Sequence, residues 1–315
     1  MKNIVIKDKD SGMRLDRWLR QEFDMPQGLV QKYLRKGLIR IEGKKVEASV
    51  RLAEGQTVTL KLLAEKRDTD IEQTQTERIS SKLTPHQIKE TQSWVMVDTP
   101  RFVVINKPAG ISVQGGSGVK DSIDARLFAL TKNGERPRLV HRLDRDTSGC
   151  LLLARTRKDA AALTKLFATR HVEKFYWALV VGVPQPYTGI IDAPLAKEMS
   201  GDEKEKMHIS EEGKHARTEY KLIEKLSTSM SLVEMKPHTG RTHQLRAHIA
   251  SIGCPIVGDG KYGDEKAYVV GEGISQKLHL HARRLVIKES GYKLDVTAPL
   301  PKHMRETFKS LGIDV

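Results

Sequence analysis

The segment of the chain best equipped for chemistry is the nonapeptide HRLDRDTSG, which runs from His141 to Gly149. It contains two carboxylates, two guanidinium groups, an imidazole and two hydroxyls. Asp144 lies between Arg142 and Arg145, and neighbouring guanidinium groups favour the ionised form of a carboxylate. An ionised and partly desolvated carboxylate can act as a nucleophile or as a base. The nonapeptide therefore predicts that Asp144 is a catalytic group.

Apolar segments flank this charged nonapeptide on both sides. Residues 150–154, CLLLA, form a short apolar run that predicts a buried strand. Residues 139–140, LV, indicate the end of another strand. Burying so polar a loop between them is costly unless its charges are paired. The alternative is a solvated turn, but the position of Asp144 between two arginines and beside apolar Leu143 favours a functional loop.

The nonapeptide resembles the signature of the pseudouridine synthases that modify large-subunit ribosomal RNA. This resemblance implies that Asp144, the first Asp of the motif, is the catalytic residue. It also implies that the target base leaves its stack, as expected of an enzyme that does chemistry on a base. Arg142, beside Asp144, could then fill the vacated space and contact RNA.

Two further segments resemble motifs of the same family. Residues 174–180, KFYWALV, imply that Tyr176 stacks on the target base, although a lone aromatic residue in a strand is more often part of the core. Residues 239–248, TGRTHQLRAH, imply an arginine that pairs with the catalytic carboxylate. We assign this role to Arg246, with Arg241 as the second candidate. The alternative is that both arginines only bind RNA phosphates.

Shorter matches extend the resemblance over nearly the whole chain. Residues 107–110, KPAG, resemble a turn that is mostly architectural in the family. The string GGSG at residues 115–118 favours the C type of synthase. Residues 258–263, GDGKYG, and 280–282, LHA, resemble late segments of the family.

Composition restricts the partners and the compartment. The 315 residues include 54 Lys and Arg against 40 Asp and Glu, a net charge of +14 that predicts a polyanionic partner. Charge alone does not separate RNA from DNA or acidic lipid.

No apolar run approaches the ~20 residues of a membrane helix, and residues 1–20 lack the apolar core of a signal peptide. With only two cysteines and no cluster of histidines, we expect no metal, no cofactor and a reducing compartment. We expect a monomer in the bacterial cytoplasm, or in an organelle if the source is eukaryotic.

The first part of the chain predicts a small RNA-binding module. Apolar residues recur with helical spacing between Leu15 and Phe23, and a second short helix follows Pro26. Residues 1–63 hold 14 basic and 8 acidic residues, and residues 25–41 hold no acidic residue. The pattern resembles a module shared by a small-subunit ribosomal protein and tyrosyl-tRNA synthetases. A helix whose charged residues are all basic favours a surface that contacts phosphates over an ordinary solvated face. The candidate RNA-binding residues of this module are Lys32, Arg35, Lys36 and Arg40.

Strand patterns outnumber helix patterns in the rest of the chain, and few follow a regular alternation of strand and helix. We therefore expect an α+β fold with a mixed, largely antiparallel sheet. Helices are predicted near residues 122–130, 158–169, 242–252 and 301–311. The expected organisation is a module at 13–63, a linker at 64–92 with a short helix near Pro85, and a catalytic domain at 93–315.

The resemblance implies an enzyme that isomerises uridine to pseudouridine in large-subunit ribosomal RNA. Asp144 would either attack the anomeric carbon of the ribose or take a proton from its neighbour. Two alternatives are an RNA-binding ribosome assembly factor without activity and a hydrolase that uses Asp144 together with Asp146. The hydrolase is less favoured, because side chains two residues apart in a turn need not converge.

Overall fold

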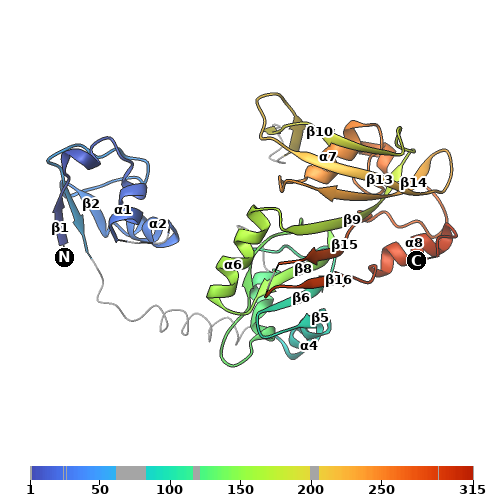
Figure 1. Cartoon of the computed structure of the whole chain (residues 1–315), viewed down its shortest axis with the longest axis horizontal. Helices are drawn as coiled ribbons and strands as arrows, with labels where there is room; N and C mark the ends of the chain where they lie inside the picture. The colour runs from blue at the N-terminus through green and yellow to red at the C-terminus, as the bar shows by residue number, and fades with distance from the viewer. Residues whose placement is uncertain are drawn as a thin grey trace. The chain divides into compact units, whose positions relative to one another are not determined.

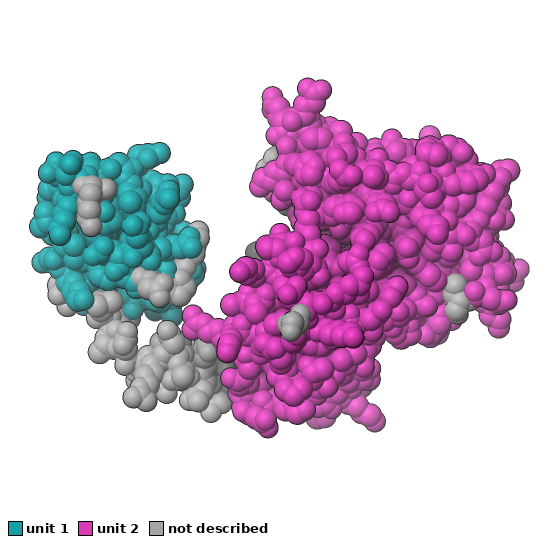
Figure 2. Space-filling view, viewed as in Figure 1, with its two compact units in different colours: residues 1–77 teal, residues 78–315 magenta. Residues whose placement is uncertain are grey.

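The computed structural model describes residues 2–23, 25, 27–61, 83–115, 121–198, 206–289 and 291–314, apart from the side chains of Lys9 and Gln27. The chain forms two compact units (Figure 2), here called the N-terminal unit, residues 1–77, and the C-terminal unit, residues 78–315. Most of the expected linker and most of the GGSG string lie outside the described residues.

In its described residues, the N-terminal unit combines two helices with a small antiparallel sheet (Figure 1). Its helices are α1 (Leu15–Phe23) and α2 (Gln27–Arg35), and a 3-10 turn spans Asp8–Asp10. The described strands lie in the order β1 (Lys2–Val5), β4 (Thr57–Leu60), β2 (Ile39–Ile41) and β3 (Lys44–Lys45). Leu15, Trp18 and Leu19 on α1 are buried in the core of this unit, as their helical spacing predicts.

A mixed sheet forms the centre of the C-terminal unit and confirms the expected α+β class. Eight of its ten described strands lie side by side in the order β10 (Thr188–Asp192), β13 (Arg217–Lys225), β14 (Met230–Pro237), β9 (Val172–Val181), β15 (Leu280–Ile287), β8 (Ser148–Ala154), β6 (Phe102–Lys107) and β5 (Val95–Asp98). The other two are β16 (Leu294–Thr297), which pairs with β15, and β7 (Arg138–Leu139), which pairs with β8. Strands β8 and β15 are parallel, and the other pairs are antiparallel. Every residue of β8 is buried, which explains its uninterrupted apolar run. A separate hairpin joins β11 (Leu195–Glu198) and β12 (Lys206–Ile209).

Helices cover the sheet at the places that the apolar spacing predicts. They are α4 (Pro85–Ser93), α5 (Ile123–Arg126), α6 (Arg157–Ala168), α7 (Gln244–Ser251) and α8 (Lys302–Ser310), with 3-10 turns at Leu127–Leu130 and Asp264–Ala267. Helix α6 packs against β8, and α7 packs against β13 and β14 on the other side of β9 (Figure 1). The short helix expected near Pro85 is therefore α4.

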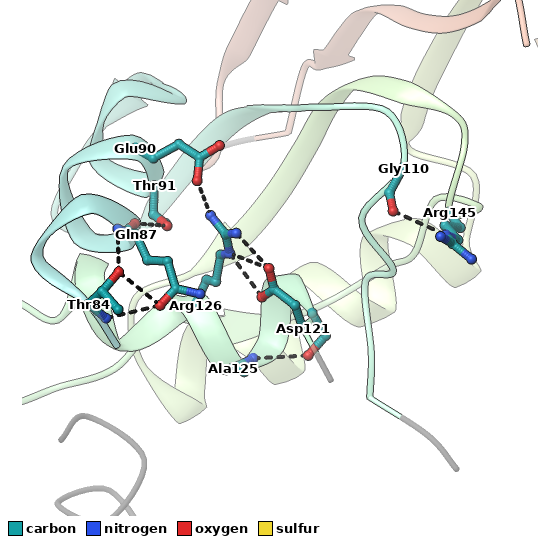
Figure 3. Close-up of polar contacts among 10 residues, drawn as sticks. Thr84, Gln87, Glu90, Thr91, Gly110, Asp121, Ala125, Arg126 and Arg145 are labelled. Carbon is teal, nitrogen blue, oxygen red and sulfur yellow. Dashed lines mark hydrogen bonds and ion pairs between the residues drawn. The ribbon is translucent and has the colours of Figure 1, made fainter. Parts of the chain in front are cut away.

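An ion-pair cluster joins α4 to α5 (Figure 3). The buried guanidinium of Arg126 donates to Asp121 at 2.9 and 2.5 Å and also binds Glu90. The hydrogen bond to Asp121, which outweighs desolvation, raises the pKa of Arg126. A reciprocal capping box between Thr84 and Gln87 starts α4. These contacts fix α4 against α5.

Gly149 allows the nonapeptide to run directly into the centre of the sheet. Its φ is +110°, a conformation that side chains disfavour. A Cβ at this position would lie 2.3 Å from the carbonyl oxygen of Ala282 on β15. Only glycine therefore permits β8 and β15 to approach as they do at the end of the nonapeptide.

Candidate active site

A cavity of about 500 Å³ opens where the nonapeptide faces the segment that leads into α7. The wall is formed mainly by residues 141–144, 167–168, 170 and 237–246 and by Lys174 and Tyr176 on β9. The five residues that the sequence predicts for the active site all line it, and they are Asp144, Tyr176, Arg246, Arg142 and Arg241. Three segments that lie far apart in the sequence thus converge on one site.

The loop that carries Asp144 is clamped to the KPAG turn. The N–H of Gly110 donates to the carbonyl of Arg145 at 2.9 Å, and Nε of Arg145 donates back to the carbonyl of Gly110 at 3.1 Å (Figure 3). Lys107, which is fully buried, donates from Nζ to the same Arg145 carbonyl at 2.8 Å. These bonds tie the loop to the end of β6 and engage the Arg145 side chain with Gly110.

Lys107, a buried ammonium, lies next to the loop that carries Asp144. Burial lowers its pKa to about 8, although the charges of Asp146 and Asp144 oppose this effect. Its side chain also donates to the carbonyl of Pro108 at 2.9 Å. The architectural role implied for the KPAG turn thus has a physical basis, since a single lysine ties the end of β6 to the loop.

The Asp144 carboxylate is partly buried and makes no hydrogen bond or ion pair with a described residue. Its backbone carbonyl accepts a bond from the N–H of Thr147 at 3.2 Å, which shapes the turn. The expected contacts to the flanking arginines are absent, because Arg142 is exposed and Arg145 binds Gly110. The carboxylate is thus open to a ligand in the cavity.

Tyr176 lies on β9 with its side chain in the cavity wall and 8% of its surface exposed. Burial and the nearby Asp144 charge both raise the pKa of its hydroxyl. The ring is therefore neutral at physiological pH and presents a flat surface close to the carboxylate. This position is compatible with stacking on a base.

Arg246 differs from the expectation in its partner. Its guanidinium forms a bidentate ion pair with Asp259, with Nε–Oδ2 at 2.7 Å and Nη2–Oδ1 at 2.6 Å. Burial lowers the pKa of Arg246, but the bond to Asp259 and the charges of Asp259 and Asp144 raise it overall. Arg246 is therefore within electrostatic reach of Asp144 but does not pair with it. The physical reason is that Asp259 is itself buried and requires a counter-charge.

Asp259 is the functional candidate that the sequence reasoning missed. It lies within the GDGKYG segment, which resembles the family without an assigned role. The same segment supplies Tyr262, whose ring lies 5.0 Å from the Arg246 guanidinium and whose hydroxyl bonds to Nδ1 of His243 at 3.0 Å. The sequence signal for Asp259 was a carboxylate flanked by glycines in this segment. That signal does not show that its partner is Arg246.

The other predicted arginines lie at the rim of the cavity. Arg241 is exposed and donates from Nε to the carbonyl of His215 at 3.0 Å. Gln244 anchors this segment, because its side-chain oxygen accepts from the Arg241 N–H at 3.1 Å. Arg170 and Lys174 add positive charge to the cavity wall. The site therefore combines one unpaired carboxylate with several cations, as a nucleotide site requires.

The predicted basic residues of the N-terminal unit lie at the surface of that unit. Arg35, Lys36 and Arg40 are exposed and Lys32 is partly exposed. The Arg40 guanidinium bonds to two loop carbonyls of its own unit, at 3.2 and 3.1 Å.

Two other features of the described residues concern metals and membranes. No group of histidine, cysteine and carboxylate side chains among them is arranged to hold a metal ion. His279 and His281 are buried and bond to protein partners. In the part of the chain that the structure describes, no helix has the length and apolar character needed to cross a membrane.

Comparisons with known proteins identify the family of the chain. Residues 101–251 match the sequence profile described as RNA pseudouridylate synthase. The chain is 34% identical over 315 residues to the ribosomal large subunit pseudouridine synthase C of Vibrio vulnificus, covering 98% of this chain and 96% of that protein. It is 34% identical over 304 residues to the protein of the same name from Rickettsia bellii, covering 95% and 98%. Human RNA pseudouridylate synthase domain containing 4 superposes with a TM-score of 0.62 at 31% identity, covering 73% of this chain and 98% of that chain.

Proposed function

The chain belongs to the RNA pseudouridylate synthase family, and from this premise we propose that it isomerises uridine to pseudouridine in large-subunit ribosomal RNA. The observation that carries the proposal is the unpaired Asp144 carboxylate in a cavity that also holds Tyr176 and Arg246. The relatives named as ribosomal large subunit synthases support the choice of RNA.

The reaction breaks the bond between N1 of uracil and C1′ of the ribose, rotates the base and joins C5 to C1′. The proton on C5 leaves, and N1 gains a proton. An ionised Asp144 fits either role at the ribose, as a nucleophile at C1′ or as a base toward C2′. Tyr176 would stack on the detached uracil and so limit its escape. Arg246, oriented by Asp259, would stabilise the negative charge on the carboxylate.

The target uridine must leave its stack to reach a cavity of this kind. We propose that Arg142, exposed at the rim, occupies the space that the flipped base leaves behind. Arg241 would contact RNA from the opposite segment of the rim. No step of this scheme needs a metal or an organic cofactor.

The N-terminal unit would add affinity for the RNA backbone through Lys32, Arg35, Lys36 and Arg40. We propose that residues 13–63 act as an RNA-binding module, residues 64–92 as a linker and residues 93–315 as the catalytic domain. We also propose that the protein acts as a monomer in the cytoplasm, where bacterial ribosomes are assembled.

The alternatives have less support. An assembly factor without activity would have no need of a carboxylate left open to the cavity. A hydrolase would need Asp144 and Asp146 to converge, but Asp146 is exposed and lines a neighbouring cavity instead.

The test is to incubate the protein with fragments of large-subunit ribosomal RNA and to map pseudouridine by carbodiimide labelling and reverse transcription. We expect the wild type to form pseudouridine and Asp144→Asn to lose at least about 1,000-fold in rate, on the order of a lost covalent or acid–base catalyst. Asp146→Asn is the matched control and should stay within about tenfold of wild type. RNA affinity of Asp144→Asn should be nearly unchanged, because phosphate contacts dominate affinity.

Three results would contradict the proposal. Pseudouridine formation by Asp144→Asn at a rate close to wild type would remove Asp144 from the mechanism. Binding of the RNA by the wild type without any pseudouridine would favour the assembly factor, and RNA cleavage would favour the hydrolase.

A further inference from the structure

Lys174 is a cation that the proposed mechanism does not use. It lies on β9 two residues before Tyr176, so both side chains project from the same face of the strand. Both line the active-site cavity. Lys174 is partly buried, and its ammonium makes no hydrogen bond or ion pair with a described residue.

An unpaired ammonium in a cavity wall is costly, because burial disfavours the charged form. Burial lowers the pKa of Lys174, and no described carboxylate opposes this effect. Lys236 on the neighbouring strand β14, by contrast, has a counter-charge, because its Nζ lies 2.6 Å from Oε1 of Glu173. Lys174 thus lines the cavity without a counter-charge among the described residues.

Lys174 and Asp144 act on different parts of the cavity. Burial lowers the pKa of His141 to about 3, and the charge of Lys174 adds to this effect. His141 stacks on Phe167 at 4.4 Å, at the end of the cavity that Arg170 also lines. The Asp144 charge acts instead on Tyr176, Arg246 and His243. The carboxylate charge thus acts on Tyr176 and the ammonium charge on His141, and all four side chains line the same cavity.

A nucleotide bound with its ribose at Asp144 carries a phosphate on each side of that ribose. Proteins fix the register of a nucleic acid mainly through such phosphate contacts. The ammonium of Lys174 can make such a contact. It has no acidic partner among the described residues, whereas the RNA substrate carries a phosphate for it to bind.

We propose that Lys174 binds an RNA backbone phosphate adjacent to the target uridine, with Arg170 beside it at the rim. The inference rests on the proposed function. It identifies Lys174 as a substrate-binding residue that sets the position of the ribose relative to Asp144.

The first test compares Lys174→Met with the matched control Lys158→Met, which removes an exposed lysine at the start of α6. Loss of a charge-assisted hydrogen bond to a phosphate should raise KM about tenfold, with a smaller effect on kcat. The salt dependence of RNA binding should flatten by ~0.7 units for one single-stranded phosphate. Lys158→Met should change neither quantity, and Lys174→Arg should retain most of both.

The second test uses RNA with one uncharged methylphosphonate linkage placed on either side of the target uridine. Wild type should bind one of these RNAs about tenfold more weakly than the natural RNA. Lys174→Met should bind that same RNA no more weakly than it binds the natural RNA, because the variant has no ammonium to pair with the phosphate.

Thermal unfolding of the free protein separates ligand binding from a structural role. Removing an unpaired, partly buried charge should leave the Tm of Lys174→Met equal to or above that of wild type. A lowered Tm, a fall in kcat with unchanged KM and salt slope, or a methylphosphonate penalty equal in both proteins would overturn the inference. Formation of pseudouridine by the wild type in the same RNA shows that such a result concerns Lys174 and not the proposed function.

Discussion

Replacing Arg246 by alanine should destabilise the C-terminal unit as well as impair catalysis. The Asp259 side chain is 0% exposed and that of Arg246 is 11% exposed. Two hydrogen bonds of 2.7 and 2.6 Å join them. The alanine variant would leave a buried carboxylate without its counter-charge, and its desolvation would no longer be offset.

Breaking a buried pair from one side costs about 3–5 kcal/mol. In a unit of this size each kcal/mol lowers Tm by about 2–4 °C. Arg246→Ala should therefore lower Tm by about 6–20 °C. Asp259→Asn should cost less than Arg246→Ala, because the exposed part of the guanidinium can still reach solvent.

Urea unfolding of wild type, the single variants Arg246→Met and Asp259→Leu and their apolar double variant measures the coupling, with Arg246→Ala unfolded in parallel. We expect the double variant to be more stable than Arg246→Ala, since no buried charge remains. Activity measured below the unfolding transition should fall in Asp259→Asn as well, because Arg246 loses its orientation. A cost below about 1 kcal/mol for Arg246→Ala, or strictly additive effects in the double variant, would refute the reasoning.

Three other outcomes follow from particular residues. Burial lowers the pKa of Lys107 from 10.5 to about 8, so the unfolded state binds more protons between these values. The free energy of unfolding of wild type should then rise relative to Lys107→Met as pH increases through this window, by at most about 1.4 kcal/mol per pH unit, and a flat difference in urea titrations would contradict this. Gly149→Ala should destabilise by more than about 2 kcal/mol in the same assay, whereas Gly28→Ala, which meets open space in α2, should stabilise by up to about 1 kcal/mol. Replacing exposed Arg35 and Lys36 by glutamine should flatten the salt dependence of RNA binding by about 0.9 units for each phosphate that these side chains neutralise, and an unchanged slope would remove them from the RNA surface.

The elements with strong local signals could be predicted from the sequence. The apolar run of β8, the spacing in α1 and the positions of α6, α7 and α8 follow from periodicities that depend only on neighbours along the chain. The nonapeptide around Asp144 was recognisable for the same reason, because all of its groups lie in one contiguous stretch.

The sequence by itself therefore determined the fold class, the elements with strong local signals and five of the residues that line the cavity. Only the tertiary structure decided which side chains meet. Arg246 binds Asp259, which lies 13 positions further along the chain, and does not bind Asp144. The parallel contact of β8 with β15 joins residues that lie 133 positions apart, such as Ser148 and His281. Local patterns report whether a residue is buried, but a buried charge takes its partner from whichever segment the chain crossings bring within hydrogen-bond distance.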